Sequence, residues 1–416
     1  MSSDSRVVVL GGGFGGLETA FNLRLLADDA AELTLISDQD HFLFKPNSIY
    51  VPFGLDPEKL KVPLAPAAKR RRIDFTRAKA TAVDTDAGTV ETEAGSFPYD
   101  RLVIATGADM RASEVPGLAE HAVSTWTPSD MLRLRWAFER LVETRRRRRV
   151  LFLVPPNNKC AGPLYEIVLM LETWLRRHDA REGTEVTWST YEDTYIQAFG
   201  PRLHEVIGKE FARRGISGHH GWVVDSVEAD AVHYENGEQL PYDLLVSFPP
   251  YVASTPFEGL PADDRGFLET DLATRKVMGH PEIFAVGDAG DFPVKQAFLA
   301  FLQADAVASH IAAELAGNEP ELDFDPVSMC VMEQFDKATF AQVPLRLTGD
   351  VSRPVEVRPD ADGAYRVGSY KAWRAGKKML GHSVPWRFRH GLPFHGGNFW
   401  RAMDTGLKAM SKVLAD

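Results

Sequence analysis

A glycine-rich turn near the start of the chain constrains its fold more than any other feature. Residues 7–10 form a β-branched run that is typical of a buried parallel strand. Gly11, Gly13 and Gly16 follow in GxGxxG spacing, with Phe14 among them, and a helical pattern begins directly afterwards. In this context the glycines permit a tight turn, close approach of a pyrophosphate, and close packing of helix on strand. Because free N–H groups at a helix start hold phosphates, the stretch predicts a dinucleotide-binding fold.

The second predicted strand, residues 33–36, departs from the usual pattern. A ribose-binding acid normally closes this strand, about 20 residues after the glycines. Here Ser37 stands at that point and Asp38 follows it. The ribose contact is therefore either the Asp38 carboxylate or the Ser37 hydroxyl.

Length and charge exclude several classes of protein. A chain of 416 residues is suited to two or three domains, and a net charge of −11 disfavours a general nucleic-acid-binding role. The basic runs 69–72 and 145–149 are either solvated charges or contacts for anionic lipid headgroups. We expect no membrane-spanning helix, because no run of 18 apolar residues occurs, and no export, because the polar start lacks an apolar signal segment.

The chain has only two cysteines, Cys160 and Cys330. Two cysteines exclude a disulfide-rich scaffold, and no metal-ligand spacing occurs, so we expect no metal site. The pair is either two inert core thiols or one redox couple.

Two later turns resemble the further fingerprints of flavoproteins with two dinucleotide-binding folds. One apolar strand ends in Ala105-Thr106-Gly107, whose small residues let the chain turn close to a cofactor. Another ends in Gly287-Asp288, where the carboxylate can accept a hydrogen bond from a ribityl hydroxyl. Together with the aromatic loop 40–46 they predict FAD, and further contacts are expected from Lys45 and Ala80.

The middle of the chain predicts a second α/β unit that has lost its nicotinamide site. After the apolar strand 150–154, the turn contains Pro155 and Pro156, which remove backbone donors that a pyrophosphate would need. Cys160 follows, and a helix from residue 164 carries Glu166 in its first turn, either as a proton carrier or as an ordinary helix-terminal acid. Lys295 opens a later helix and either stabilises negative charge on a reduced flavin or lies on the surface.

The C-terminal portion is rich in aromatic residues and ends in an amphipathic pattern. Apolar residues recur from Trp400 to Leu414 at alternating spacings of three and four, opposite Arg401, Lys408 and Lys412. Such a helix either packs on its own domain or lies in a membrane interface.

These patterns predict an α/β fold with two Rossmann-like domains, the second inserted in the first. The expected boundaries are 1–110 with 280–318 for the FAD domain and 111–279 for the second domain. Residues 319–416 are expected to form an α+β region, for which the family resemblance described next implies a face toward a membrane and a quinone.

The sequences around the two cysteines identify the chain as resembling sulfide:quinone oxidoreductases. The matching stretches are KCAGPLYEIVLML at 159–171 and MCVMEQFDKATFAQVP at 329–344, with LTLISDQDHFLFKP, VPLAP, LVIATG and IFAVGDAG elsewhere. The resemblance implies that Cys160 and Cys330 meet beside the flavin and that hydrosulfide opens the disulfide or polysulfide bridge between them. It further implies that Cys330, the cysteine nearer to the flavin, passes two electrons to the flavin. It also implies a quinone site among C-terminal residues, for which we expect Phe335, Phe340, Trp373, Lys377, Trp386 and Phe388.

One departure concerns sulfur release. Many members have a third cysteine at a place corresponding to about Trp126, which this chain lacks. Sulfide and a quinone are the expected substrates, with peripheral contact on the cytoplasmic face of a membrane and possible homo-oligomerisation. The alternatives are a flavocytochrome c-type sulfide dehydrogenase flavoprotein, an NADH:quinone reductase, or a flavin–thiol redox sensor without turnover.

Overall fold

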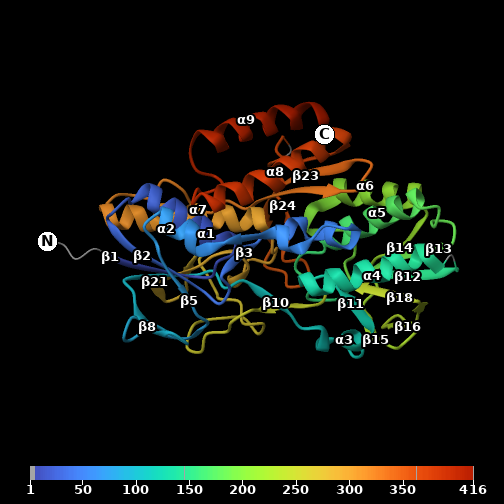
Figure 1. The fold of residues 1–416 in the computed structure, drawn as a ribbon, viewed down its shortest axis with the longest axis horizontal. Helices are drawn as coiled ribbons and strands as arrows, with labels where there is room; N and C mark the ends of the chain where they lie inside the picture. The colour runs from blue at the N-terminus through green and yellow to red at the C-terminus, as the bar shows by residue number, and fades with distance from the viewer. Residues whose placement is uncertain (1–4, 145, 362, 416) are drawn as a thin grey trace.

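The structure is a computed structural model that describes residues 5–144, 146–361 and 363–415, with residues 397–399 described by their backbone alone. Two parallel sheets lie side by side along the long axis of the molecule, and two C-terminal helices lie across one side (Figure 1). The polar residues 1–4 and position 145 of the second basic run lie outside the described residues.

The first sheet is built around the N-terminal strand and its glycine turn. Strand β1 (Ser5–Leu10) is apolar and buried over its last four residues, as expected for a central parallel strand. Helix α1 (Phe14–Leu26) follows it and packs on α7 (Ala297–Ala316). The strand order is β20 (Lys276–Val277), β21 (His280–Ala285), β9 (Arg101–Ile104), β1 (Ser5–Leu10), β2 (Ala31–Ser37) and β5 (Asp74–Arg77), with only β20 antiparallel among these described strands.

The second sheet is wholly parallel and comes from the middle of the chain. Its order is β11 (Ala122–Ser124), β18 (Leu244–Ser247), β12 (Arg148–Val154), β13 (Thr184–Thr190) and β14 (Ile216–His219). Helices α4 (Pro128–Thr144), α5 (Gly162–Arg177) and α6 (Gly200–Arg214) belong to the same part of the chain. Because the first sheet takes strands from both sides of this segment, the predicted fold class is confirmed; the exact domain boundaries stay a prediction.

Smaller sheets and short helices accompany the two units. They are β3 (His41–Leu43) with β4 (Lys61–Pro63), α2 (Leu64–Arg70), β6 (Ala80–Asp84) with β7 (Thr89–Thr92) and β8 (Gly95–Pro98), β10 (Ala108–Met110) with β19 (Tyr251–Ala253), α3 (Leu118–His121), and β15 (Val224–Val227) with β16 (Ala231–Tyr234) and β17 (Gln239–Pro241).

The C-terminal region forms a small antiparallel sheet covered by helices. Strand β22 (Val327–Glu333) carries Cys330 and pairs with β23 (Ala338–Leu347), which also contacts β24 (Val355–Val357) and β25 (Arg366–Tyr370). Phe340, one of the residues expected at a quinone site, lies inside β23 opposite Val331, because this strand begins at Ala338. Helix α8 (Lys371–Arg389) follows, and α9 (Gly397–Leu414) ends the chain.

Helix α9 packs on its own protein. Met403 is buried, and Trp400, Leu407 and Met410 lie against the core, while Val413 is 78% exposed. The segment that leads into α9 is tied to α1, since the Glu18 carboxylate accepts hydrogen bonds from the backbone N–H groups of Phe394 (2.6 Å) and His395 (2.7 Å). His395 Nδ1 also pairs with the Asp305 carboxylate. Glu18, Asp305 and His395, whose side chains are of the types that can bind a metal ion, thus make hydrogen bonds to one another or to the backbone.

In the described part of the chain, one helix, α7, is long and apolar enough to cross a membrane. Two thirds of its apolar window, 67%, is buried inside the protein, where α7 packs on α1. Its apolar composition is therefore accounted for by the protein core.

The first basic run, 69–72, is partly engaged with the protein. Arg71 Nε donates to Gly391 O at 2.6 Å, and Arg72 pairs with Asp28 and Asp29. In the second run, Arg149 pairs with Asp243 at 3.1 Å.

Candidate active site

A cavity of about 1310 Å³ brings together most of the residues singled out in the sequence. It extends from the glycine turn after β1 to the start of α5 and to strand β22. Its lining includes Gly11, Gly13, Phe14, Ser37, Asp38, Lys45, Ala80, Ala105, Thr106, Gly107, Cys160, Glu166, Gly287, Asp288, Lys295, Cys330, Phe340 and Lys377.

The glycine turn fits a bound pyrophosphate. Gly11 has φ +112°, and a Cβ there would lie 2.2 Å from the carbonyl oxygen of Ala105. A Cβ on Gly16 would lie 1.9 Å from the carbonyl oxygen of Gly11. Glycine is therefore needed at position 16 for the helix to pack closely on the turn. Gly13, in contrast, faces open space in the cavity. Among the described residues no side chain caps the start of α1, so its first N–H groups remain available to an anion.

Ser37 and Asp38 both line the cavity at the end of β2. Ser37 is buried, and its Oγ accepts a hydrogen bond from the backbone N–H of Gln39 at 3.3 Å. Asp38 is exposed and contacts Gln39 Nε2 at 3.3 Å. Both remain available to a ribose.

Two lysines lie near Asp288: Lys295 is buried, whereas Lys45 is exposed where it lines the cavity. Lys295 Nζ donates to Gly290 O and lies 3.8 Å from the centre of the Phe267 ring, and burial lowers its pKa to about 7 against the opposing charge of Asp288. Lys45 Nζ lies 3.2 Å from the centre of the Trp126 ring, and desolvation by the surrounding protein lowers its pKa to about 8. Burial raises the pKa of Asp288, while both lysines oppose that shift.

The two free thiols share this cavity although they are far apart in sequence. Cys160 lies in the turn before α5, and Cys330 lies in β22. Burial raises the pKa of Cys160, and the neighbouring Cys330 thiol adds to this effect. Burial raises the pKa of Cys330 to about 12, with Glu166 adding and Lys377 opposing. The fold therefore brings both sulfurs into one electrostatic environment.

Asn158 fixes the turn that carries Cys160, although no sequence pattern had singled it out. Its Oδ1 accepts the Cys160 N–H at 3.0 Å, and its Nδ2 donates to Phe248 O at 2.8 Å. Tyr191 Oη donates to Asn158 O at 3.2 Å. The Cys160 turn is thereby anchored to segments that follow β13 and β18.

A buried charged network lies beside Cys330. Lys377 Nζ donates to Glu166 Oε1 and to Val331 O (2.8 Å), while Glu166 Oε1 also accepts the Glu333 N–H at 2.6 Å. Glu333 is fully buried and pairs with Arg374 Nε at 2.7 Å. Burial raises the pKa of Glu166, and Lys377 opposes the shift. Glu333 and Arg374 were not predicted, because only the tertiary fold brings them to this strand.

The six residues expected at a quinone site do not converge on one place. Phe340 and Lys377 line the main cavity; Trp373 is buried and stacks on Phe340 with ring centres 4.3 Å apart. Phe388 is buried beside Phe21 and Phe42, Trp386 is 56% exposed, and Phe335 lines a separate cavity of about 500 Å³. Among the apolar residues of the two C-terminal helices and the segment between them, those that line the main cavity include Leu380, Val384, Phe394, Trp400 and Leu407.

A family model described as pyridine nucleotide-disulphide oxidoreductase matches residues 5–143 and 174–304. The chain belongs to this family.

Individual relatives agree with the resemblance seen in the sequence. The sulfide-quinone reductase of Aquifex aeolicus is 34% identical over 270 residues, which are 61% of this chain and 59% of that protein. A solved structure of the sulfide:quinone oxidoreductase from the same organism has a TM-score of 0.84 at 25% identity and covers 99% of this chain and 96% of that one. A type II NADH:quinone oxidoreductase of Mycobacterium tuberculosis is 26% identical over 79% of this chain and 78% of that protein. The sequence match to the first relative thus spans about three fifths of its length.

Like other pyridine nucleotide-disulphide oxidoreductases, this protein has two nucleotide-type α/β units, and its glycine cradle implies a flavin in the first. In the second unit, the turn after β12 contains Pro155 and Pro156, and Glu192 beyond β13 accepts hydrogen bonds from Thr190 Oγ1 (3.0 Å) and the Gln197 N–H (2.9 Å). Glu192, the acid that follows the second strand of this unit as a ribose-binding acid would, is therefore engaged in hydrogen bonds within the protein.

Proposed function

We propose that this chain is an FAD-dependent sulfide:quinone oxidoreductase. The observation that carries the proposal is the meeting of Cys160 and Cys330 in the same cavity as the dinucleotide cradle. Two inert core thiols would have no need to line a cavity of that size.

The residues that would hold FAD follow the cavity wall. The turn at Gly11–Gly13 and the start of α1 would receive the pyrophosphate, and Ser37 or Asp38 the adenosine ribose. Ala80, Ala105–Gly107 and Gly287–Asp288 would complete the cradle, with Lys45 and Lys295 as the nearby cations. When bound, the flavin supplies a two-electron acceptor for the thiol pair and a donor for the quinone.

The sulfur chemistry begins from a Cys160–Cys330 disulfide. Hydrosulfide attacks one sulfur, the S–S bond breaks, and the products are one cysteine persulfide and one thiolate, with no net change in electrons. In the assignment that we propose, Cys160 takes the sulfur and Cys330 is left as the thiolate. Transfer of two electrons to a bound flavin, with loss of the persulfide proton, would rejoin Cys160 and Cys330 through the added sulfur. A second hydrosulfide would then remove that sulfur as HSS⁻ and restore the Cys160–Cys330 disulfide.

The charges around Cys330 affect how readily its thiol ionises. Because burial raises the pKa of Cys330 to about 12, a thiolate there is a strong electron donor in a site that disfavours its charge. Lys377 is the cation that opposes this effect, and Glu166 holds Lys377 in place. Glu166, buried with a raised pKa, can also carry a proton released in the exchange.

We place the quinone at the apolar C-terminal end of the cavity. Phe394, Trp400 and Leu407 line that end together with Leu380 and Val384 of α8. Both α8 and α9 lie on the outer side of the molecule (Figure 1), and Trp386 and Met379 on α8 are exposed. We accordingly propose peripheral contact of this side with a membrane, on its cytoplasmic face; homo-oligomerisation stays a prediction.

The rival functions predict different behaviour. An NADH:quinone reductase needs a nucleotide turn rich in backbone donors, which the proline pair after β12 does not offer. A flavin–thiol sensor would be reduced by sulfide without being recycled by a quinone. A flavocytochrome-type enzyme would pass its electrons to a c-type haem protein instead of a quinone.

The test is anaerobic addition of sulfide to the flavin-loaded protein, followed by a soluble quinone, while flavin absorbance is recorded. We expect bleaching with sulfide and recovery with quinone, and loss of the first phase in Cys160→Ser and Cys330→Ser. Bleaching that persists in both serine variants would refute the role of the thiols. Rapid bleaching by NADH would restore the NADH reductase hypothesis.

A further inference from the structure

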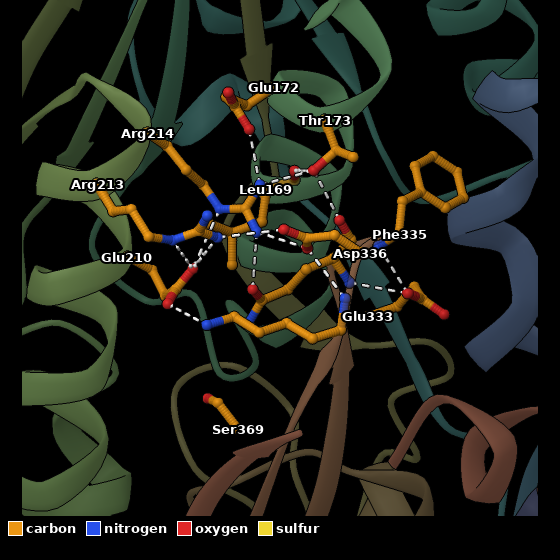
Figure 2. Close-up of polar contacts among 12 residues, drawn as sticks. Leu169, Glu172, Thr173, Glu210, Arg213, Arg214, Glu333, Phe335, Asp336 and Ser369 are labelled. Carbon is orange, nitrogen blue, oxygen red and sulfur yellow. Dashed lines mark hydrogen bonds and ion pairs between the residues drawn. The ribbon is translucent and has the colours of Figure 1, made fainter. Parts of the chain in front are cut away.

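A buried arginine on α6 lies at the junction of the two cysteine-bearing segments. Arg214 has a fully buried side chain, and it lies between α5 and the turn that joins β22 to β23 (Figure 2). Helix α5 begins two residues after Cys160, and the turn begins four residues after Cys330.

The guanidinium of Arg214 contacts both sides at once. Toward α5, Nη1 donates to Glu172 Oε2 at 2.7 Å and to Thr173 Oγ1 at 2.6 Å. Toward the turn, Nη2 donates to Gln334 Oε1 at 3.0 Å and to Asp336 Oδ1 at 2.7 Å. The two terminal nitrogens are thus divided between the two segments.

Secondary contacts reinforce the same junction. Thr173 Oγ1 donates to Gln334 O at 2.8 Å, and Lys337 Nζ of the turn donates to Glu210 Oε1 of α6 at 2.5 Å (Figure 2). Burial disfavours the charge of Asp336, but hydrogen bonds from Arg214 and Arg213 hold its pKa below the usual range. The turn therefore remains ionically tied to α6 at neutral pH.

We propose that Arg214 is a positioning residue that holds the turn after the Cys330 strand against α5, the helix that follows Cys160, so that the two thiols can close a disulfide. This inference rests on the proposed sulfur chemistry and goes beyond it, because Arg214 touches neither thiol. Glu166, which accepts the Glu333 N–H, fixes the same strand nearer to Cys330.

The quantity that positioning controls is the effective concentration of one thiol at the other. When the pair closes, two thiols lose two electrons and two protons, and oxidised dithiothreitol takes them up to become reduced dithiothreitol. The equilibrium constant of that exchange measures how well the fold holds the sulfurs together, whatever the flavin does afterwards.

The matched variants are Arg214→Lys and Arg24→Lys. A lysine keeps the charge but carries its donors on a single nitrogen, which cannot divide them between α5 and the turn. Arg24 is equally suited as a control, since it is buried and donates to Ala31 O (3.2 Å) and Arg72 O (2.8 Å) in the first sheet, away from both cysteines. Asp336→Asn leaves the contacts of Arg214 with α5 in place and alters the turn side, including the pair between Arg213 and Asp336 at 3.2 Å, so it provides a milder second variant.

The experiment equilibrates each flavin-loaded protein anaerobically in dithiothreitol redox buffers and counts free thiols by alkylation and mass spectrometry, with thermal unfolding midpoints recorded in parallel. We expect Arg214→Lys to lower the disulfide equilibrium constant about tenfold and Asp336→Asn to lower it by a smaller factor. Arg24→Lys should leave the disulfide equilibrium constant unchanged, even if its unfolding midpoint falls as far as that of Arg214→Lys.

An Arg214→Lys protein that closes the disulfide as well as the unaltered protein would overturn the positioning role alone. Equal losses in Arg214→Lys and Arg24→Lys would likewise overturn it, since they would reflect general destabilisation. An unaltered protein that forms no Cys160–Cys330 disulfide would overturn the proposed function and the positioning role together.

Discussion

The substitution Lys377→Met tests the charged network beside Cys330. Lys377 is 8% exposed and donates to Glu166 Oε1 and Val331 O, while Glu166 is 5% exposed. Methionine fills a similar volume without the charge, so the variant leaves a buried carboxylate whose remaining donor in the described network is the Glu333 N–H. Removing one partner of a buried ion pair costs about 3–5 kcal/mol, which we expect as the loss in unfolding free energy at neutral pH.

The loss should depend on pH with a definite sign. The folded-state pKa of Glu166 is already raised by burial, and removal of Lys377 raises it further. A carboxyl group with a raised folded pKa destabilises the protein as pH rises from its unfolded to its folded pKa. The gap between variant and unaltered protein therefore widens by up to about 1.4 kcal/mol per pH unit between the two folded pKa values of Glu166.

Urea unfolding of both proteins over a pH series measures this gap, with the exposed neighbour Lys378→Met as the control. We expect the control to change the unfolding free energy by less than about 0.5 kcal/mol at every pH. A loss in Lys377→Met that is the same at all pH values would refute the assignment of the cost to an uncompensated Glu166 carboxylate.

Three further predictions concern the cradle and the aromatic residues. Gly16→Ala should prevent stable folding of the flavin domain, because its Cβ would meet Gly11 O at 1.9 Å. Gly13→Ala should fold but lose flavin, because its Cβ would point into the cavity. Unfolding midpoints and flavin-to-protein absorbance ratios distinguish the two variants. Trp373→Ala should lower the unfolding free energy by about 3–5 kcal/mol, whereas Trp386→Ala, at an exposed position, should change it by less than about 0.5 kcal/mol; urea unfolding measures both. Trp400→Ala should slow flavin recovery with quinone more than Trp386→Ala does, and equal rates in stopped-flow traces would contradict our placement of the quinone.

The nucleotide cradle could be predicted from the sequence because its physics is local. Strand, turn and helix succeed one another between Ser5 and Leu26, and Gly16 is required by the Gly11 carbonyl five residues earlier. Only the contact between Gly11 and the Ala105 carbonyl comes from a distant strand. The sequence could not decide between Ser37 and Asp38 as the ribose contact, and the structure shows that both residues line the cavity.

The meeting of Cys160 and Cys330 could not be worked out from local patterns. Neither a strand context nor a helix context reveals that β22 will lie against α5, and the expectation came from the family resemblance. Glu333, Arg374 and Arg214 were missed because acids and arginines on predicted helices and turns are usually solvated.

The aromatic tail shows which part of the quinone prediction lacked a geometric basis. At about 100° per residue, Trp386 lies about 220° around α8 from Trp373, so the two could not face one pocket. Trp373 and Lys377, four residues apart, do share the inner face, and both are buried. Composition alone indicated an aromatic site, and helical periodicity separates its members.

The most direct test of the account is peptide mapping of the oxidised, flavin-loaded protein under non-reducing conditions. The account predicts a peptide pair that joins Cys160 to Cys330, directly or through additional sulfur atoms, and that is lost on treatment with sulfide. Two thiols that remain separately alkylated after mild oxidation would contradict it.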